Sequence, residues 1–278
     1  AIGLVGSEMC IRDSIKTLKS NDVFEEAFIF ATNGTEISTE WSKTVINECK
    51  KISKEISKED IDTRRDYRSL NFVTIDGSNA KDFDDAVYAE ELSDGFRLYV
   101  AIADVSAYVT KDSQLDKEAF SRATSVYFEK KVIPMLPELI SNQLCSLRPN
   151  EDKLVLTCEI YLDNRGEIKD FEFFNSVICS KNRLTYDEVE KFYQKGQTAL
   201  LDDAVNNLRV LKKIHSLRRK IREDRKAIDF YLPEYRPVGK DNKIIKFKAT
   251  SHLLANEVIE ESMICLLYTS DAADEQQR

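Results

Sequence analysis

Four aspartates lie within ten positions of one another, and these residues carry the clearest chemical signal in the sequence. Asp76, Asp82, Asp84 and Asp85 follow an apolar stretch at residues 72–75 that predicts a strand, and Gly77 allows a sharp turn after it. Carboxylates this close repel one another, so a stable fold needs a reason to keep them together. A divalent cation supplies one, and oxygen ligands without His or Cys favour Mg²⁺, or alternatively Mn²⁺, over Zn²⁺. Mg²⁺ held by a few carboxylates serves phosphate chemistry.

Other interpretations compete with this metal site. An acidic, solvated turn is the common explanation of an isolated Asp-x-Asp-Asp triplet. An EF-hand fits poorly, because the loop lacks a Gly at its sixth position and a Glu at its twelfth. A zinc site is disfavoured because the cysteines have no CxxC spacing, so we expect reduced and mostly buried thiols. The residues concerned are Cys49, Cys145, Cys158 and Cys179, with only His215 and His252 as imidazoles.

The stretches that flank the aspartates form an ordered series of motifs. Ile75-Asp76-Gly77 is followed by Ala80-Lys81-Asp82-Phe83-Asp84-Asp85-Ala86-Val87. Further motifs stand at residues 64–68, 100–106, 124–128, 133–138, 144–147 and 259–264. The series, from about residue 60 to 264, resembles the ribonuclease II/ribonuclease R family and its RNB catalytic domain. The residues of its motifs are closer to those of the ribonuclease R branch. The order of the series argues against coincidence.

The resemblance implies a hydrolase that degrades single-stranded RNA from its 3′ end, in the 3′→5′ direction, and releases nucleoside 5′-monophosphates. The acidic positions of the family carry over to the four aspartates of this sequence. Asp76 and Asp85 are then the best direct Mg²⁺ ligands. Asp84 is the candidate for positioning the attacking water or the RNA 3′ end, and Asp82 is either a ligand or a hydrogen-bonded support.

The resemblance also implies three residues that bind RNA. Tyr127 matches an aromatic clamp of the family, and Phe230 aligns with the partner ring on the other side of the terminal base. Glu260 matches an acidic residue that contacts the sugar of a terminal nucleotide. Core packing is the competing explanation for both rings, since composition alone favours it.

The two ends of the chain have an unusual relationship. Residues 9–14 and 265–270 can be read as translations of opposite strands of one DNA sequence, as expected for translated ends of sequencing-library DNA. We therefore expect residues 1–14 and 265–278 to be non-native and to pack poorly. Residues 15–62 are predicted to end a preceding cold-shock-type domain and to form a connecting helix. Residues 63–264 are predicted to be the N-terminal portion of the catalytic domain.

Composition bounds the class of protein. An apolar fraction of 42%, with 14 Phe and 11 Tyr, supports a folded core. No apolar run is long enough to cross a membrane, and we expect a cytoplasmic monomer without membrane association. The formal charge of −8 argues against nonspecific nucleic-acid binding over the whole surface but leaves room for a local basic groove.

Hydrophobic patterning predicts the elements that position the aspartates. Strands are predicted at 86–92 and 96–105, joined by a turn at 93–95, and at 154–162 and 168–180, joined by a turn at 163–166. Helices are predicted at 37–62, 114–124, 185–193, 201–226 and 251–264, the last capped by Ser251, with a short strand at 244–247. The pattern predicts an α+β domain with a mixed, largely antiparallel sheet surrounded by helices.

Several charged residues permit two interpretations each. The basic faces of the 201–226 helix fit either an RNA path or a solvated surface. Arg64, Arg65 and Arg68 pair with carboxylates or phosphates, or form a solvated turn. Asp104, at a strand end, orients the acidic loop or caps its own strand.

Three functions remain open at the level of the sequence. The leading one is a Mg²⁺-dependent, processive exoribonuclease. The alternatives are a catalytically incomplete RNA-binding remnant and another Asp-rich, metal-dependent phosphohydrolase or glycosyltransferase. The family carries a further catalytic arginine and a basic S1-type domain beyond the last matching motif, so we expect the 278-residue chain to have little exoribonuclease activity by itself.

Overall fold

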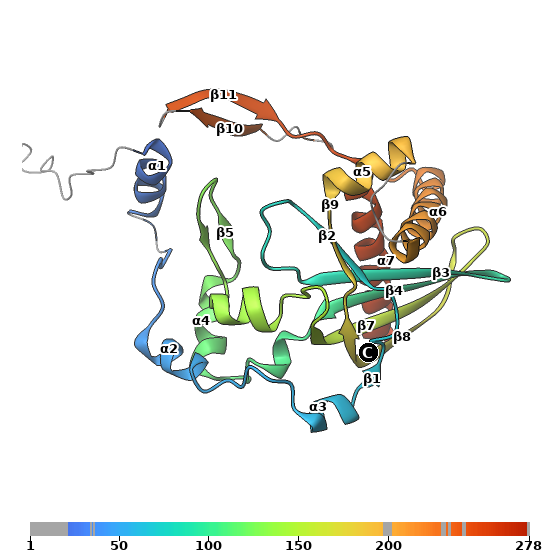
Figure 1. The fold of residues 1–278 in the computed structure, drawn as a ribbon, viewed down its shortest axis with the longest axis horizontal. Helices are drawn as coiled ribbons and strands as arrows, with labels where there is room; N and C mark the ends of the chain where they lie inside the picture. The colour runs from blue at the N-terminus through green and yellow to red at the C-terminus, as the bar shows by residue number, and fades with distance from the viewer. Residues whose placement is uncertain are drawn as a thin grey trace, which may run out of the picture. The chain divides into compact units, whose positions relative to one another are not determined.

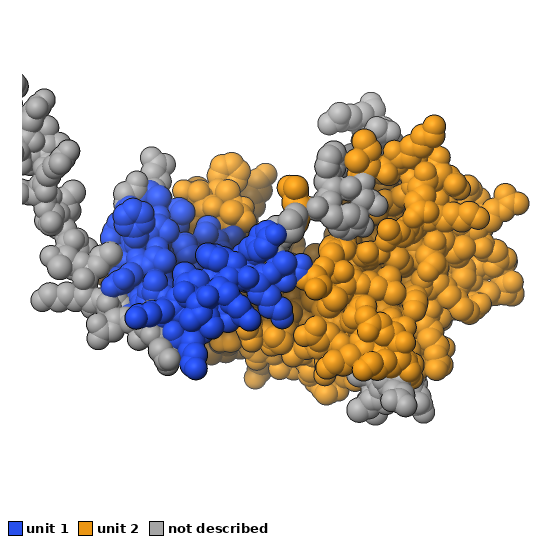
Figure 2. All heavy atoms as spheres, turned by 90° about the horizontal axis from the view of Figure 1, so that it is seen from above, with its two compact units in different colours: residues 1–40, 125–133, 233–250 blue, residues 41–124, 134–232, 251–278 orange. Residues whose placement is uncertain are grey.

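The structure, a computed structural model, describes residues 22–33, 35, 37–196, 202–228, 232, 235–240 and 243–276. The chain forms two compact units (Figure 2). The small unit comprises Ala1–Glu40, Ser125–Ile133 and Pro233–Thr250, and the large unit comprises Trp41–Thr124, Pro134–Leu232 and Ser251–Arg278. Each unit is described by itself.

A seven-stranded sheet is the centre of the large unit (Figure 1). Its order is β1-β8-β7-β4-β3-β2-β9, in which only the outermost pairs, β1 with β8 and β2 with β9, are parallel. The predicted α+β class with a largely antiparallel sheet is therefore confirmed. The strands are β1 (Arg65–Asp66), β2 (Val73–Asp76), β3 (Asp85–Leu92), β4 (Gly95–Ala103), β7 (Asp152–Asp163), β8 (Ile168–Cys179) and β9 (Asn182–Thr185).

Both predicted hairpins are present in this sheet. The first joins β3 to β4, in a register that runs from Asp85 opposite Ile102 to Leu92 opposite Gly95. A Cβ atom on Gly95 would lie 2.0 Å from the Leu162 carbonyl oxygen, so the close approach of β7 requires glycine there. The second hairpin joins β7 to β8, and Gly166 in its turn has a φ of +83°.

Helices cover both faces of the sheet, each over its own hydrophobic core. On one face α5 (Tyr186–Lys195) and α6 (Asp202–Asp224) pack against α7 (Leu254–Gln276) (Figure 1). The core beneath them includes Val87, Leu98 and Ile160. The core on the other face includes Ala86, Tyr99 and Val155, and is closed by α2 (Lys43–Cys49), α4 (Gln114–Arg122) and a π-helical turn, η3 (Ile140–Leu144). Adjacent strand residues alternate between the two cores, as the pleat requires.

Two helix predictions need correction. The connecting helix expected at 37–62 is two short helices, α2 and α3 (Lys58–Asp62), because the Ser57 side chain caps a new helix in a capping box with Asp60. The helix expected at 251–264 begins at Leu254 rather than after Ser251, and it continues to Gln276.

Residues near the C-terminus pack better than the sequence predicted. Cys265 is fully buried against the core under α7, and Thr269 is 2% exposed. The expectation of poor packing is therefore wrong for these two residues, because the amphipathic pattern of α7 continues past residue 264 and keeps them facing the sheet. Residues 1–14 lie outside the described residues, so the same expectation stays untested there.

The described residues of the small unit form one helix and two hairpins. They are α1 (Val23–Thr32), β5 (Val126–Tyr127) with β6 (Val132–Ile133), and β10 (Tyr235–Lys240) with β11 (Lys243–Ala249). Phe28 on α1 meets Phe128 edge-on at 5.0 Å, and Lys130 forms an ion pair with Asp22 at 2.7 Å. In the parts of the chain that are described, no helix is both long and apolar enough to span a membrane.

Candidate active site

The aspartates sit where two neighbouring strands end and begin at the same edge of the sheet. Asp76 is the last residue of β2, and Asp85 is the first residue of β3, which runs antiparallel beside β2. Because the loop between them leaves the sheet and returns at the adjacent strand, Asp76 and Asp85 are held near each other by β-sheet hydrogen bonds. Asp82 and Asp84 lie on that loop, residues 77–84.

Side chains and backbone from distant segments fix the acidic loop. The Arg183 guanidinium, on β9, donates hydrogen bonds of 2.9 Å to the carbonyl oxygens of both Gly77 and Ser78. The Ser146 hydroxyl donates to the Lys81 carbonyl at 2.8 Å and accepts from the Phe83 amide at 3.2 Å. These bonds satisfy polar backbone groups of a loop that would otherwise be free to rearrange.

The two ends of the loop are fastened as well. The Gly77 amide donates to the Asp76 carboxylate at 2.6 Å. The amide of Leu147 donates to the Phe83 carbonyl at 2.8 Å, and the amide of Ala103 donates to the Asp84 carbonyl at 2.9 Å. Phe83 itself points into the second core and is 8% exposed. The loop is therefore preorganised, with its aspartates placed by the fold.

Burial and mutual repulsion make three of the carboxyl groups hard to ionise. Burial raises the pKa of Asp76 and of Asp84, and the negative charge of Asp82 raises both further. Burial also raises the pKa of Asp85 to about 7, with added contributions from Asp84 and Asp76. The Asp85 Oδ2 atom is buried and has no hydrogen-bond partner. A buried carboxylate oxygen without a partner costs free energy that a bound cation would offset.

The aspartates fit Mg²⁺ by their chemistry but do not form a closed cage. Among the residues described, no group of three or more His, Cys, Asp or Glu side chains is arranged to hold a metal ion. Convergence of all four aspartates on one ion therefore stays a prediction. Mg²⁺ commonly takes one or two protein carboxylates and fills its other positions with water and substrate phosphate. The unpartnered oxygen of Asp85 and the nearby carboxylate of Asp76 suit such an open arrangement.

Tyr186 is a member of this site that the sequence did not reveal. It is the first residue of α5, and β9 places it there by pairing Thr185 with Asp76. Burial, together with the charges of Asp76, Asp85 and Glu260, raises the pKa of Tyr186 to about 12, so its hydroxyl keeps its proton. The Thr185–Glu188 capping box fixes the start of α5, but no local signal in the sequence links Tyr186 to the aspartates.

Glu260 lies on α7, within electrostatic reach of Tyr186. Its carboxylate is exposed and contacts His252, with 2.9 Å between Oε1 and the ring Nε2. The fold thus brings Glu260 toward the aspartates through Tyr186, although 175 positions separate it from Asp85 in the sequence. Its contact with a nucleotide sugar stays a prediction.

Comparison with known proteins identifies the domain to which these residues belong. The sequence profile of the RNB domain matches residues 64–266. The chain belongs to the RNB family. The matched RNB segment includes all four aspartates, Arg183, Tyr186 and Glu260.

Individual RNB proteins give the same result. Ribonuclease R of Acidithiobacillus ferrooxidans is 47% identical over 193 residues, which cover 69% of this chain and 44% of that protein. Ribonuclease R of Escherichia coli strain K12 is 40% identical over 234 residues, or 82% of this chain and 29% of that protein. The structure of Mycoplasma genitalium RNase R in complex with ribose-methylated single-stranded RNA has a TM-score of 0.76 and 37% identity, and covers 81% of this chain and 35% of that one. The chain thus spans less than half the length of these relatives.

The two aromatic residues of the predicted RNA clamp have different outcomes. Tyr127 is on β5 in the small unit and is 65% exposed, so core packing does not explain it. Phe230 lies outside the described residues. A clamp formed by the two rings stays a prediction.

Several arginines of the RNB segment form ion pairs within the fold. Arg222 on α6 binds Glu261 on α7 at 3.1 Å, and Arg219 binds Glu257 on the same helix. An RNA path along these arginines is therefore not supported. Arg64 binds Asp104 at 2.6 Å, and Arg68 binds Asp66 at 2.7 Å and Asp152 at 2.9 Å.

These pairs also settle the place of Asp104. Its carboxylate accepts hydrogen bonds from the Arg64 guanidinium at 2.6 Å and from the Ser106 hydroxyl at 2.5 Å. It therefore joins the chain before β1 to the end of β4 and does not orient the acidic loop through a hydrogen bond that the structure describes.

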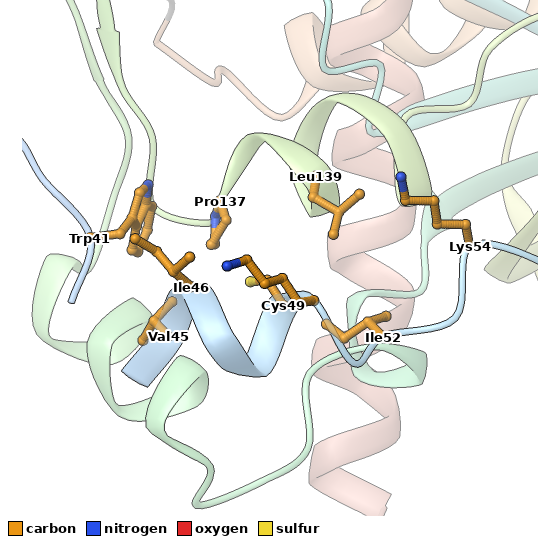
Figure 3. Close-up of a pocket in the computed structure, with 9 residues that line it drawn as sticks. Trp41, Val45, Ile46, Cys49, Ile52, Lys54, Pro137 and Leu139 are labelled. Carbon is orange, nitrogen blue, oxygen red and sulfur yellow. The ribbon is translucent and has the colours of Figure 1, made fainter. Parts of the chain in front are cut away.

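An apolar pocket of about 390 Å³ lies elsewhere in the large unit (Figure 3). The side chains of α2 form one wall and the segment around Leu139 forms the other, with Lys54 at the rim. The lining residues are Trp41, Val45, Ile46, Cys49, Lys50, Ile52, Lys54, Pro137 and Leu139. None of the four aspartates lines it, so it is not part of the acidic site.

Proposed function

We propose that this chain carries the catalytic aspartates of a 3′→5′ exoribonuclease that hydrolyses single-stranded RNA to nucleoside 5′-monophosphates. The observation that carries the proposal is the preorganised acidic loop within the RNB segment, with a buried Asp85 oxygen that lacks a partner. The relatives named ribonuclease R, and one of them bound to single-stranded RNA, support the same conclusion. The activity is proposed for the whole protein that contains this segment.

Asp76 and Asp85 would hold Mg²⁺, or alternatively Mn²⁺, at the edge of the sheet. When bound there, the cation would neutralise charge on the scissile phosphate and lower the pKa of a coordinated water. Asp84 accepts a hydrogen bond from the attacking water and orients it in line with the bond to be broken. Asp82 is either a further ligand or a hydrogen-bonded support.

The reaction moves few atoms. The water oxygen bonds to the phosphorus of the last nucleotide, and the bond from that phosphorus to the 3′ oxygen of the preceding nucleotide breaks. The 3′ oxygen takes a proton, so the shortened RNA ends in a hydroxyl group and the last nucleotide leaves as a 5′-monophosphate. Tyr186, which stays protonated beside Asp76 and Asp85, offers a hydroxyl donor to the phosphate.

Other residues would hold the substrate in place. Tyr127 and Phe230 would stack on the terminal bases, and Glu260 would accept a hydrogen bond from a ribose hydroxyl. The 2′-hydroxyl would then distinguish RNA from DNA. We also propose that the protein is a cytoplasmic monomer, that residues 15–62 comprise the end of a preceding cold-shock-type domain and a connecting segment, and that residues 1–14 and 265–278 are non-native.

The test replaces the matching segment of Escherichia coli ribonuclease R with residues 64–264 and measures mononucleotide release from single-stranded RNA. Asp84→Asn should lower turnover by at least about a hundredfold, because a group that acts on the reacting atoms is lost, while RNA binding changes little. Asp94→Asn is the matched control, because Asp94 lies in the exposed turn between β3 and β4. Unchanged turnover in Asp84→Asn would overturn the proposal. RNA binding without turnover in the unmodified chimera would favour the RNA-binding remnant.

A further inference from the structure

The β10–β11 hairpin of the small unit has a composition unlike the rest of the chain. Residues 235–249 contain five cations and one carboxylate, Asp241, whereas the whole chain has a formal charge of −8. The cations are Arg236, Lys240, Lys243, Lys246 and Lys248. All five are exposed, and no ion pair with a described carboxylate is formed by any of them.

Strand pairing sorts the side chains of the hairpin onto two faces. Arg236 lies opposite Lys248, and Lys246 is two residues from Lys248, so these three cations share one face. The opposite face carries Tyr235 and Phe247, which are 62% and 64% exposed. The hairpin therefore presents cations on one side and aromatic rings on the other.

Three arginines of α6 differ from the hairpin cations because they form ion pairs within the fold. Arg218 and Arg222 reach Glu261, and Arg219 reaches Glu257, so these three positive charges are neutralised by α7. The carboxylates near the hairpin, Asp22 and Glu25 at the start of α1, instead form ion pairs with Lys130 and Lys131. Solvated cations beside exposed rings are the combination that binds single-stranded nucleic acid, through phosphates and stacked bases.

We propose that the β10–β11 hairpin binds single-stranded RNA, with Arg236, Lys246 and Lys248 on phosphates and with Tyr235 and Phe247 stacked on bases. The inference rests on the proposed function and extends it to a contact that neither the aspartates nor Glu260 provides. Neighbouring strands are only about 4.8 Å apart, so RNA that crosses the edge of this narrow ribbon can meet both faces. Tyr127, exposed in the same unit, offers a third ring.

The first test measures the salt dependence of RNA binding by the 278-residue chain. A fluorescein-labelled oligouridine of about 15 nucleotides, near the upper size of known single-strand sites, is titrated in EDTA over a series of KCl concentrations. The variant Arg236→Gln/Lys246→Gln/Lys248→Gln should bind at least tenfold more weakly at low salt. Its slope of log K against log [KCl] should be shallower by about 2, since each phosphate contact contributes about 0.7 for single strands.

A control with the same change in net charge distinguishes a specific RNA-binding site on the hairpin from a general effect of charge on RNA binding. Lys43→Gln/Lys58→Gln/Lys111→Gln removes three exposed cations from the large unit. It should retain the slope and nearly all of the affinity. Equal losses in the two triple variants, or wild-type binding by the hairpin variant, would overturn the proposal, as would a wild-type chain that does not bind the RNA.

The second test concerns the rings. Phe247→Ala should weaken binding about fivefold or more, because stacking on an aromatic ring stabilises a bound base. Phe120→Ala is the matched control, since Phe120 is 86% exposed on α4 of the large unit and carries no proposed contact. If Phe247→Ala changes only thermal stability or oligomeric state, the hairpin is a protein contact and the proposal is wrong.

These measurements test the hairpin contact separately from the proposed exonuclease activity. Binding is measured in EDTA without turnover, and mononucleotide release is measured in the chimera with Asp84→Asn. Normal RNA affinity in both hairpin variants, together with loss of turnover in Asp84→Asn, would refute the hairpin contact and leave the exonuclease standing. The reverse pair of results would refute the exonuclease alone.

Discussion

Asp85 begins β3 and Asp104 directly follows the neighbouring strand β4, and each has at least one carboxylate oxygen shielded from solvent, but only Asp104 has partners for its carboxylate. Burial alone would raise the pKa of Asp104, but hydrogen bonds from Ser106 and Arg64 outweigh burial and hold it below its usual range. Asp85 has no such partner, and burial raises its pKa to about 7. The chain can neutralise a buried carboxylate when the role is structural. The unsatisfied state of Asp85 is therefore better explained by a ligand than by the needs of the fold.

The largest expected effect is the loss of folding stability when Asp104, like Asp85, is left without a positively charged partner. Arg64→Met leaves the Asp104 carboxylate buried without a counter-charge, with only hydrogen bonds such as that from Ser106, and breaking a buried ion pair costs about 3–5 kcal/mol. Urea unfolding at neutral pH should show that loss. Below about pH 4 the loss should shrink, because a protonated Asp104 no longer needs a counter-charge.

The control for that experiment is Arg165→Met, at an exposed arginine in the turn between β7 and β8. It should change the free energy of unfolding by less than about 0.5 kcal/mol. Equal losses in the two variants would mean that Asp104 does not depend on Arg64.

The second expected effect has the opposite sign. Because the folded pKa of Asp85 lies above its unfolded value, ionisation of Asp85 takes stability away as the pH rises from about 4 to above 7. Asp85→Asn removes that loss, so the variant should match wild type near pH 4 and be more stable near pH 8 without metal. The gain should be a few kcal/mol at most, since one pKa unit corresponds to about 1.4 kcal/mol. A gain that does not vary with pH would contradict this explanation, and Asp94→Asn should show no gain.

The smallest expected effect is the stabilisation of the folded chain by Mg²⁺ bound at Asp85. Mg²⁺ at ten times its dissociation constant should stabilise the wild-type chain near pH 8 by about 1.4 kcal/mol, because it binds only the folded state. Asp85→Asn should lose most of that increment, whereas Arg165→Met should retain it. Thermal melts with and without Mg²⁺ measure it. An equal increment in wild type and Asp85→Asn would place the cation elsewhere.

Local patterns predicted much of this fold. Alternating residues and glycine turns located both large hairpins, and the Thr185–Glu188 box located the start of α5. The four aspartates were found because they are adjacent in the sequence. The helix boundaries differ where the prediction overlooked the capping signal at Ser57 and where it wrongly assigned Ser251 as a cap.

The supports of the site could not be predicted in the same way. Ser146 and Arg183 lie 60 or more positions after the loop to which they are hydrogen-bonded, and no local sequence pattern links them, or Tyr186, to the aspartates. Their function depends on strand order, which brings β9 beside β2. The charges of α6 were ambiguous for the same reason, since only the packing of α7 decides which arginines are neutralised.

The buried cysteines give the two faces of the sheet separate chemical reporters. Cys158 and Cys265 belong to the core under α6 and α7, and Cys49 and Cys145 belong to the core on the other face. Burial raises the pKa of Cys145 and Cys265 to about 12 and of Cys158 to about 11, so the native thiols hardly react with alkylating reagents. Alkylation must await an opening of the core around each thiol, and its rate therefore measures how often that face opens. Mass spectrometry of the modified peptides would thus show whether RNA or Mg²⁺ tightens one face, both or neither.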